Sequence, residues 1–125
     1  MDPSNAGLLL IVNTRTDQKL ADRARIAQSY NSRMRGLLNI RELEEGLGLL
    51  IPRCNAIHTF FMKMTIDVVF LDRTFHVVRL FPAASAFRVF WGGWKARAVI
   101  ELPTGTIQRT GTQRGDLLAC HPELS

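Results

Sequence analysis

The sequence predicts a mainly β fold, a β-sandwich or partly open barrel with one short helix packed on the sheet. Short apolar, β-prone runs recur at regular spacing along the 125 residues, and turn residues separate them. In addition, the chain carries a single substantial helix signal, at residues 29–36. No repeat, low-complexity tract or linker interrupts this pattern, so we expect one domain spanning residues 1–125.

The N-terminal third contains two strand candidates and the helix. Residues 7–13 are apolar and end in a polar turn, which predicts a strand. Residues 19–28 fit either a helix face or, through their alternation, a hairpin partner of the first strand, and we favour the strand. The helix at residues 29–36 begins at Ser29 or Ser32, both good N-cap residues.

The rest of the chain alternates between strands and turns. Residues 48–52 form a buried strand that ends at Pro52, whose missing N–H disfavours a central position in a sheet. The run 56–62 has apolar side chains on both faces, so we expect a central strand covered on both sides. The other predicted elements are strands at 66–72, 76–81, 97–102 and 116–120, a loop at 83–95 and a turn with a short helix at 104–111.

The charge of the chain bears on its partners. The net charge of +5 favours acidic partners such as nucleic acid or anionic lipid, but the basic residues are spread along the chain, which is typical of a solvated surface. No apolar run approaches the roughly 20 residues of a spanning helix, and residues 1–7 lack a basic leader segment. We expect a monomer without a cofactor, cytoplasmic if the sequence is complete and exported if a leader has been removed.

The two cysteines, Cys54 and Cys120, are far apart in the sequence and form no CxxC motif. This spacing does not imply a disulfide, and we expect both to be buried free thiols.

Five short motifs occur in order along the chain. They are Arg35-Gly-Leu-Leu38, Ile57-His-Thr-Phe-Phe-Met62, Ile66-Asp-Val-Val-Phe-Leu-Asp72, Ile100-Glu-Leu-Pro-Thr-Gly105 and Gly115-Asp116. Together they resemble the domain of unknown function 192 family. The resemblance covers about residues 24–120 and implies a compact β-rich domain with a short helix and no assigned activity. Many members of the family look exported.

A metal site is one hypothesis for the central stretch, since Cys54, His58 and Met62 are of types that bind soft ions. On a helix the three would share one face. On a strand, Cys54 and His58 would lie roughly 13 Å apart, too far to share an ion. The β-prone residues around them favour the strand, so we expect no metal site.

Two carboxylates interrupt apolar strands, and a buried charge of this kind must be paired or hydrogen-bonded. We expect Asp67 and Glu101 to form structural ion pairs with Arg35, Lys63 or Arg97. The alternative is that these two acids and His58 surround a shared pocket and perform acid–base chemistry. No sequence motif supports a named reaction, so an enzyme is the less favoured alternative.

Residues 79–97 interleave aromatic and basic side chains and form the best candidate for a binding surface. Such a segment can stack bases and contact phosphates, as in single-strand nucleic-acid binders, or hold a sugar or a partner protein. Alternatively, Phe87 and Trp91 fold back as a lid over the core. Gly92 and Gly93 form a mobile hinge between Trp91 and Trp94, so we expect at least one of these two rings to be exposed. The candidate residues are Arg88, Phe90, Trp91, Trp94, Lys95 and Arg97.

Together these observations predict a non-catalytic binding or accessory module. Its ligand, a small molecule or a protein, would occupy a groove between the aromatic segment and the region of His58, Asp67 and Glu101. The alternatives are an enzyme or metal-binding protein that uses these three residues, and a single-stranded nucleic-acid binder, which we do not favour.

Overall fold

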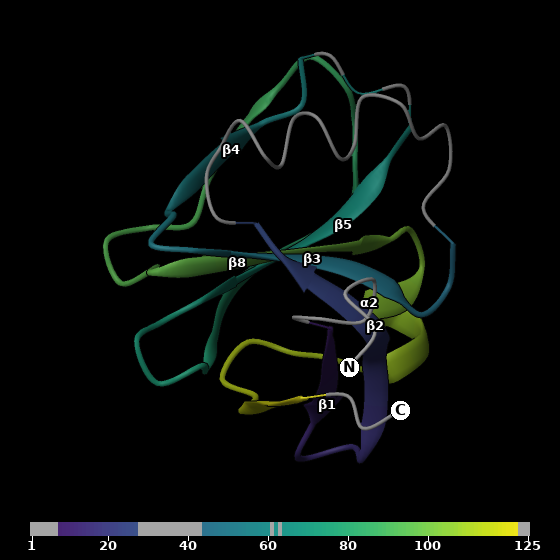
Figure 1. Cartoon of the computed structure of the whole chain (residues 1–125). Coiled ribbons are helices and arrows are strands. Elements are labelled where there is room, and N and C mark those ends of the chain that lie inside the picture. The colour runs from purple at the N-terminus through teal and green to yellow at the C-terminus, as the bar shows by residue number, and fades with distance from the viewer. Residues whose placement is uncertain (1–7, 28–43, 61, 63, 123–125) are drawn as a thin grey trace.

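A computed structural model describes residues 8–27, 44–60, 62 and 64–122 and is dominated by one strongly curved sheet (Figure 1). The sheet has seven strands in the order β6-β5-β8-β3-β2-β1-β9, and a separate two-stranded sheet pairs β4 with β7. The elements are β1 Leu9–Asn13, β2 Gln18–Ile26, β3 Leu47–Pro52, β4 Ala56–His58, β5 Ile66–Leu71, β6 Val77–Ala84, β7 Val89–Trp91, β8 Ala98–Pro103, α2 Thr106–Thr110 and β9 Leu118–Pro122.

The large sheet curls into a partly open barrel. Its two edge strands, β6 and β9, approach each other at one end, where His76 and Leu117 form an isolated antiparallel bridge. The amide of Val77 also donates to the Asp116 carbonyl at 2.8 Å. Closing a sheet in this way hides edges that would otherwise be open to pairing with other chains. The predicted mainly β fold with a short helix is confirmed, in its barrel form.

The barrel separates two apolar layers. The interior is filled by alternate residues of the strands, and Ile107 of α2 packs into the same cluster. The second layer lies outside the barrel, between β5, β8 and the small β4–β7 sheet. Strands β5 and β8 are therefore buried on both faces along their whole length. The interior core consists of Ile11, Leu20, Ala21, Ala24, Leu50, Val69, Leu71, Val77, Ala98, Ile100, Leu102, Ile107 and Leu118.

Several predicted elements differ from the observed ones. Strand β3 lies in the middle of the sheet, between β8 and β2, contrary to the expectation drawn from Pro52. This is tolerated because Pro52 is the last residue of the strand, where it interrupts no further pairing. The predicted loop 83–95 contains strand β7, and strand β6 continues past Pro82 because it is an edge strand.

The run 56–62 is not a central strand, which corrects the prediction. Among the described residues of this run, only Ala56–His58 form a strand, and it pairs with β7 in the small outer sheet. The run has apolar residues on both sides, which led to the prediction of a central strand. In the structure one side packs on the barrel, while the other remains partly exposed. Strand β2 confirms the strand interpretation of residues 19–28. The helix predicted at 29–36 lies outside the described residues.

The described part of the chain contains no helix long and apolar enough to cross a bilayer. Cys54 and Cys120 do not form a disulfide with each other, and both are half-buried. Burial raises the pKa of Cys120 to about 11, so its thiol stays protonated at neutral pH.

Candidate functional site

Exposed apolar side chains gather on the outer face of the small β4–β7 sheet and on the segments next to it. Five of the seven large apolar side chains that are exposed in the described structure lie here, whereas soluble surfaces usually scatter such residues singly. We call this region the aromatic face; it comprises Phe60, Phe87, Val89, Trp91 and Trp94.

The small sheet presents this face because its two sides differ. Ile57 and Phe90 are paired across β4 and β7 and point toward the barrel. The Phe90 ring lies 5.1 Å from that of Phe81, which in turn meets the buried Phe70 ring edge-on at 6.0 Å. By alternation, His58 and Val89 point outward. Phe90 is therefore an anchor to the core and is only half-exposed. It was predicted as a residue of the binding surface, but its ring packs inward.

The predicted lid over the core is wrong. Phe87 is 75% exposed and Trp91 42% exposed, and Phe90 covers the core in their place. Tertiary packing decides which of several neighbouring rings faces inward, and aromatic composition does not reveal this choice. The remaining tryptophan, Trp94, is 84% exposed.

The two tryptophans are held in place by a tightly packed turn. A Cβ atom on Gly92 would lie 2.4 Å from the Phe70 ring and 2.6 Å from Ala96 Cβ, so only glycine allows this approach. The expected hinge at Gly92 is thus a buried contact. The Trp91 and Trp94 rings meet edge-on at 5.2 Å. Two arginine side chains donate to their carbonyls: Arg79 of β6 to that of Trp91 at 3.0 Å, and Arg97, just before β8, to that of Trp94 at 2.9 Å.

Two adjoining hollows lie on the surface beyond Trp94. One, of about 300 Å³, is lined by Asp72, Arg73, Thr74, Lys95 and Arg97. The other, of about 430 Å³, is lined by Arg53, Cys54, Asn55, Arg73, Ala96 and Arg97. Arg73 and Arg97 line both, so we call the four cations Arg53, Arg73, Lys95 and Arg97 the basic cluster.

The sequence pattern indicates only part of the basic cluster. Lys95 and Arg97 belong to the predicted surface, but Arg53 and Arg73 come from the end of β3 and the β5–β6 turn. Arg53 has a positive φ of 52°, which is uncommon outside glycine. Such a backbone conformation often marks a functional position, but it cannot be read from the sequence. Arg88, which was predicted together with Lys95, precedes β7 and so lies at the opposite end of that strand.

Asp67 is fully buried, and backbone amides satisfy its carboxylate. Oδ1 accepts a hydrogen bond from the Ala83 amide and Oδ2 one from the Ile107 amide, both at 2.8 Å. Ala83 sits in a bulge of β6 with a φ of 50°, and Ile107 lies in the first turn of α2. Asp67 therefore ties a bulged edge strand and the helix to β5. Its predicted ion-pair partners Arg35 and Lys63 lie outside the described residues.

The hypothesis that Asp67, Glu101 and His58 surround a shared acid–base pocket is wrong. In the antiparallel ladder Asp67 is opposite Leu102 and Val68 is opposite Glu101, so the two carboxylates point to opposite faces of the sheet. Glu101 is fully buried in the layer outside the barrel. Its predicted partners Arg35 and Lys63 lie outside the described residues.

His58 is half-buried on β4 and stacks on Phe60, with ring centroids 4.9 Å apart. Its Nδ1 accepts from the Phe60 amide at 3.4 Å. Of the predicted metal ligands, Met62 is buried in the outer layer and the Cys54 thiol donates to the Ala56 carbonyl at 3.1 Å. Within the described ranges, no three His, Cys, Asp or Glu side chains are grouped to hold a metal ion.

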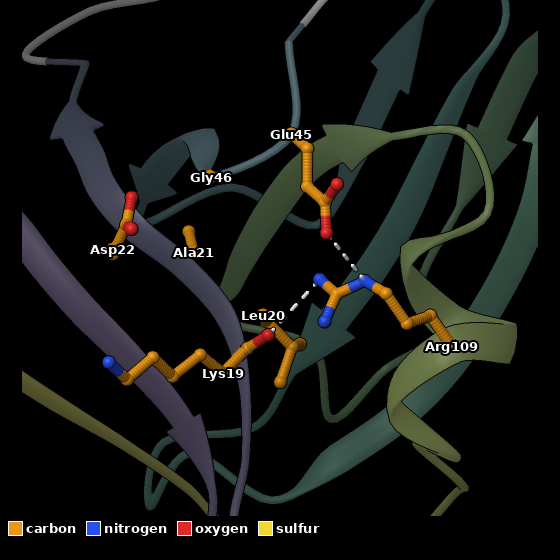
Figure 2. Close-up of a pocket in the computed structure, with 7 residues that line it drawn as sticks. All are labelled: Lys19, Leu20, Ala21, Asp22, Glu45, Gly46 and Arg109. Atoms are coloured by element: carbon orange, nitrogen blue, oxygen red, sulfur yellow. Dashed lines mark hydrogen bonds and ion pairs between the residues drawn. The ribbon is translucent and has the colours of Figure 1, made fainter.

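A third hollow, of about 330 Å³, lies between β2 and α2 (Figure 2). Figure 2 shows Arg109 reaching across it from α2, where it donates to the Lys19 carbonyl at 3.1 Å and pairs with Glu45 at 3.3 Å. Because the charge of Arg109 already has an internal partner, this hollow is a weaker candidate than the basic cluster beside Trp94.

Comparisons with known proteins agree with the fold. The model of the family DUF192, described as "Uncharacterized ACR", matches residues 11–120, further toward the N-terminus than the resemblance predicted. A UPF0127 protein of Thermococcus kodakarensis is 32% identical over 117 residues, covering 90% of this chain and 74% of the relative. A UPF0127 protein of Pyrococcus horikoshii is 34% identical over 111 residues, covering 86% and 95%. A crystal structure of a protein of unknown function from Novosphingobium aromaticivorans superposes with a TM-score of 0.75 at 18% identity, covering 90% of this chain and 83% of the other.

Proposed function

The chain belongs to the DUF192 family, whose relatives are uncharacterised, and from its surface we propose that it is a non-catalytic binding domain. The aromatic face is its binding surface, and Trp91 and Trp94 are the residues that hold a planar or apolar part of the ligand. Such rings supply a large contact area with little conformational freedom to lose.

One observation carries this proposal, the concentration of exposed large apolar residues on the small sheet. Leaving such side chains in water is unfavourable by roughly 25 cal/mol per Å² of apolar area, and a partner that covers the face regains that free energy. The face is also rigid, because Phe90 and Gly92 anchor its inner side on Phe70 and Phe81. A preorganised surface loses less entropy when it binds.

The separation of the buried groups supports a role in binding over a role in catalysis. Asp67 is occupied by two backbone amides and faces the barrel interior, while Glu101 faces the opposite side of the sheet. Acid–base catalysis requires such groups to converge on one reacting atom. The groove expected between the aromatic segment and all three residues therefore gives way to a site on the outer face of β4 and β7.

The proposal is tested by a thermal-shift screen of ligands with the wild-type protein and two variants. Ligands that bind the native state raise the melting temperature. Trp94→Ala removes a largely exposed ring, so it should change the free energy of unfolding by less than about 0.5 kcal/mol but abolish the ligand shift.

Leu117→Ala is the matched control, since Leu117 is exposed and lies away from the aromatic face, beside β9. It should keep the full ligand shift. If every ligand that stabilises the wild type stabilises Trp94→Ala equally, the aromatic face is not the binding surface.

A further inference from the structure

The basic cluster beside Trp94 holds an excess of positive charge. Four cations line the two hollows, against a single carboxylate, Asp72. Each hollow contains the shared pair Arg73 and Arg97 and one further cation, Lys95 in one and Arg53 in the other. This arrangement offers two adjacent positions for negatively charged groups.

These charges are not neutralised within the described part of the chain. The ion pairs that it contains involve other cations, and none reaches Arg53, Arg73 or Lys95. Asp72 is committed to the β5–β6 turn, because its Oδ1 accepts from the His76 and Thr74 amides at 2.9 Å and from the Thr74 hydroxyl at 3.0 Å. An external anion is therefore the natural counter-charge.

One cation of the cluster is also linked to the aromatic face. Nη1 of Arg97 donates to the Trp94 carbonyl at 2.9 Å and to the Ala96 carbonyl at 3.0 Å, which fixes this guanidinium at the backbone of the turn that carries Trp94. A guanidinium presents donors in a planar fork that matches phosphate oxygens. Positive charge is thus held at the turn from which the exposed Trp94 ring, available for stacking, projects.

We propose that this surface binds single-stranded nucleic acid, with neighbouring phosphates in the two hollows and bases stacked on Trp94 and Trp91. This inference rests on the proposed function and names the chemistry of its ligand. Proteins that bind single strands combine a basic track for the backbone with aromatic side chains for the bases. The ligand of the aromatic face is therefore anionic as well as planar.

A strand fits this surface better than one nucleotide does. The aromatic face continues along β7 from Trp94 and Trp91 to Val89 and Phe87, and Arg88 provides a further cation at that far end. A mononucleotide would use the two hollows and one ring and leave the rest of the face uncovered. Successive bases and phosphates of a strand can follow its whole length.

The test measures binding of a short fluorescein-labelled oligothymidylate by anisotropy as the salt concentration is varied. Each phosphate neutralised on a single strand contributes about −0.7 to the slope of log affinity against log salt, so four cations predict a slope of about −2.8. The affinity should then fall about 50-fold between 50 and 200 mM salt.

The double variant Arg53→Gln/Arg73→Gln should halve this slope, leaving a loss of about 7-fold over the same salt range. Its matched control is Arg25→Gln/Arg114→Gln, which removes the same charge from exposed positions outside the cluster and should keep nearly the wild-type slope. Trp94→Ala should weaken binding about 5- to 150-fold, as expected for one stacked base, with the slope unchanged.

The proposal is overturned if the oligothymidylate does not bind at 50 mM salt, or if the cluster variant and the control variant lose the same slope. Complete displacement of the strand by inorganic pyrophosphate at equal concentration would assign the hollows to a small phosphorylated ligand. Binding to phosphatidylserine vesicles without binding to the strand would assign the face to a membrane surface. Both results contradict the nucleic-acid inference, while ligand shifts lost in Trp94→Ala would still support the aromatic face as a binding surface.

Discussion

The buried carboxylate Asp116 gives the sharpest quantitative prediction for stability. It is only 6% exposed and lies at the point where the barrel edges meet. Its Oδ1 accepts from Arg15 Nε at 2.7 Å, and its Oδ2 accepts from Asn13 Nδ2 at 2.8 Å and from the Gln113 amide at 2.7 Å. The hydrogen bond from Arg15 is the main reason why the pKa of Asp116 is lowered to about 2, against the opposing effect of burial.

The size of the effect follows from this pKa. Lowering a carboxyl pKa from 3.8 to about 2 on folding stabilises the native state by about 2 kcal/mol, since one pKa unit is worth about 1.4 kcal/mol. The pKa is lower in the folded than in the unfolded chain, so the stabilisation is complete above about pH 5. It is lost as the pH falls from there through the folded pKa of about 2.

We therefore expect Asp116→Asn to reduce the free energy of unfolding by about 2 kcal/mol at pH 7 and by less than about 1 kcal/mol at pH 2.5. Urea denaturation of wild type and variant at both pH values measures the difference. Asp22→Asn is the control, because Asp22 is exposed and its pair with the exposed Arg23 should contribute less than about 0.5 kcal/mol. A penalty for Asp116→Asn that is the same at pH 7 and pH 2.5 would refute the reasoning.

Two further substitutions test contacts that position the sheet and the aromatic face. Gly92→Ala should lower the free energy of unfolding by about 1–3 kcal/mol and shift the tryptophan emission, because its Cβ would clash with Phe70. Gly115→Ala is the control, because Gly115 has a φ of 92° but an added Cβ would meet no atom within 4 Å. It therefore tests backbone strain alone and should leave the tryptophan emission unchanged. Equal emission changes in Gly92→Ala and Gly115→Ala would contradict the close-packing argument. Asp67→Ala leaves the buried Ile107 amide and the part-buried Ala83 amide without an acceptor, and the buried amide alone should cost about 1–3 kcal/mol. Asp67→Asn keeps one acceptor and should cost less. Hydrogen exchange of the Ala83 and Ile107 amides provides the direct measurement, and unchanged exchange in Asp67→Ala would contradict the assigned role.

The family motifs acquire a structural meaning from these contacts. Asp67, in the motif 66–72, links β5 to the β6 bulge and to α2. Asp116, in Gly115-Asp116, joins the β1–β2 turn to the segment before β9. Both acids maintain the barrel through hydrogen bonds to distant segments. This explains why the motifs identify the fold clearly while leaving the reaction, substrate or partner open.

Much of the fold can be predicted from the sequence, because the responsible interactions are local or periodic. Residues 66–71 combine β-branched and aromatic side chains, which predicts a strand. Burial on both faces, however, was predicted for residues 56–62 and is found in residues 66–71 instead. Turn residues after Asn13 and around Asp72 mark the hairpins correctly. The concentration of aromatic and basic residues in 79–97 likewise indicates where the exposed rings lie.

The tertiary structure alone decides which side chains meet. The register of β5 and β8 places Asp67 and Glu101 on opposite faces, and a shift of one residue would reverse this. Likewise, Arg53 and Arg73 join Lys95 and Arg97 only because the end of β3 and the β5–β6 turn come together beside Trp94. The sequence by itself determines the mainly β fold and the aromatic segment through local pattern. The candidate site depends on long-range strand pairing, which composition and periodicity do not encode.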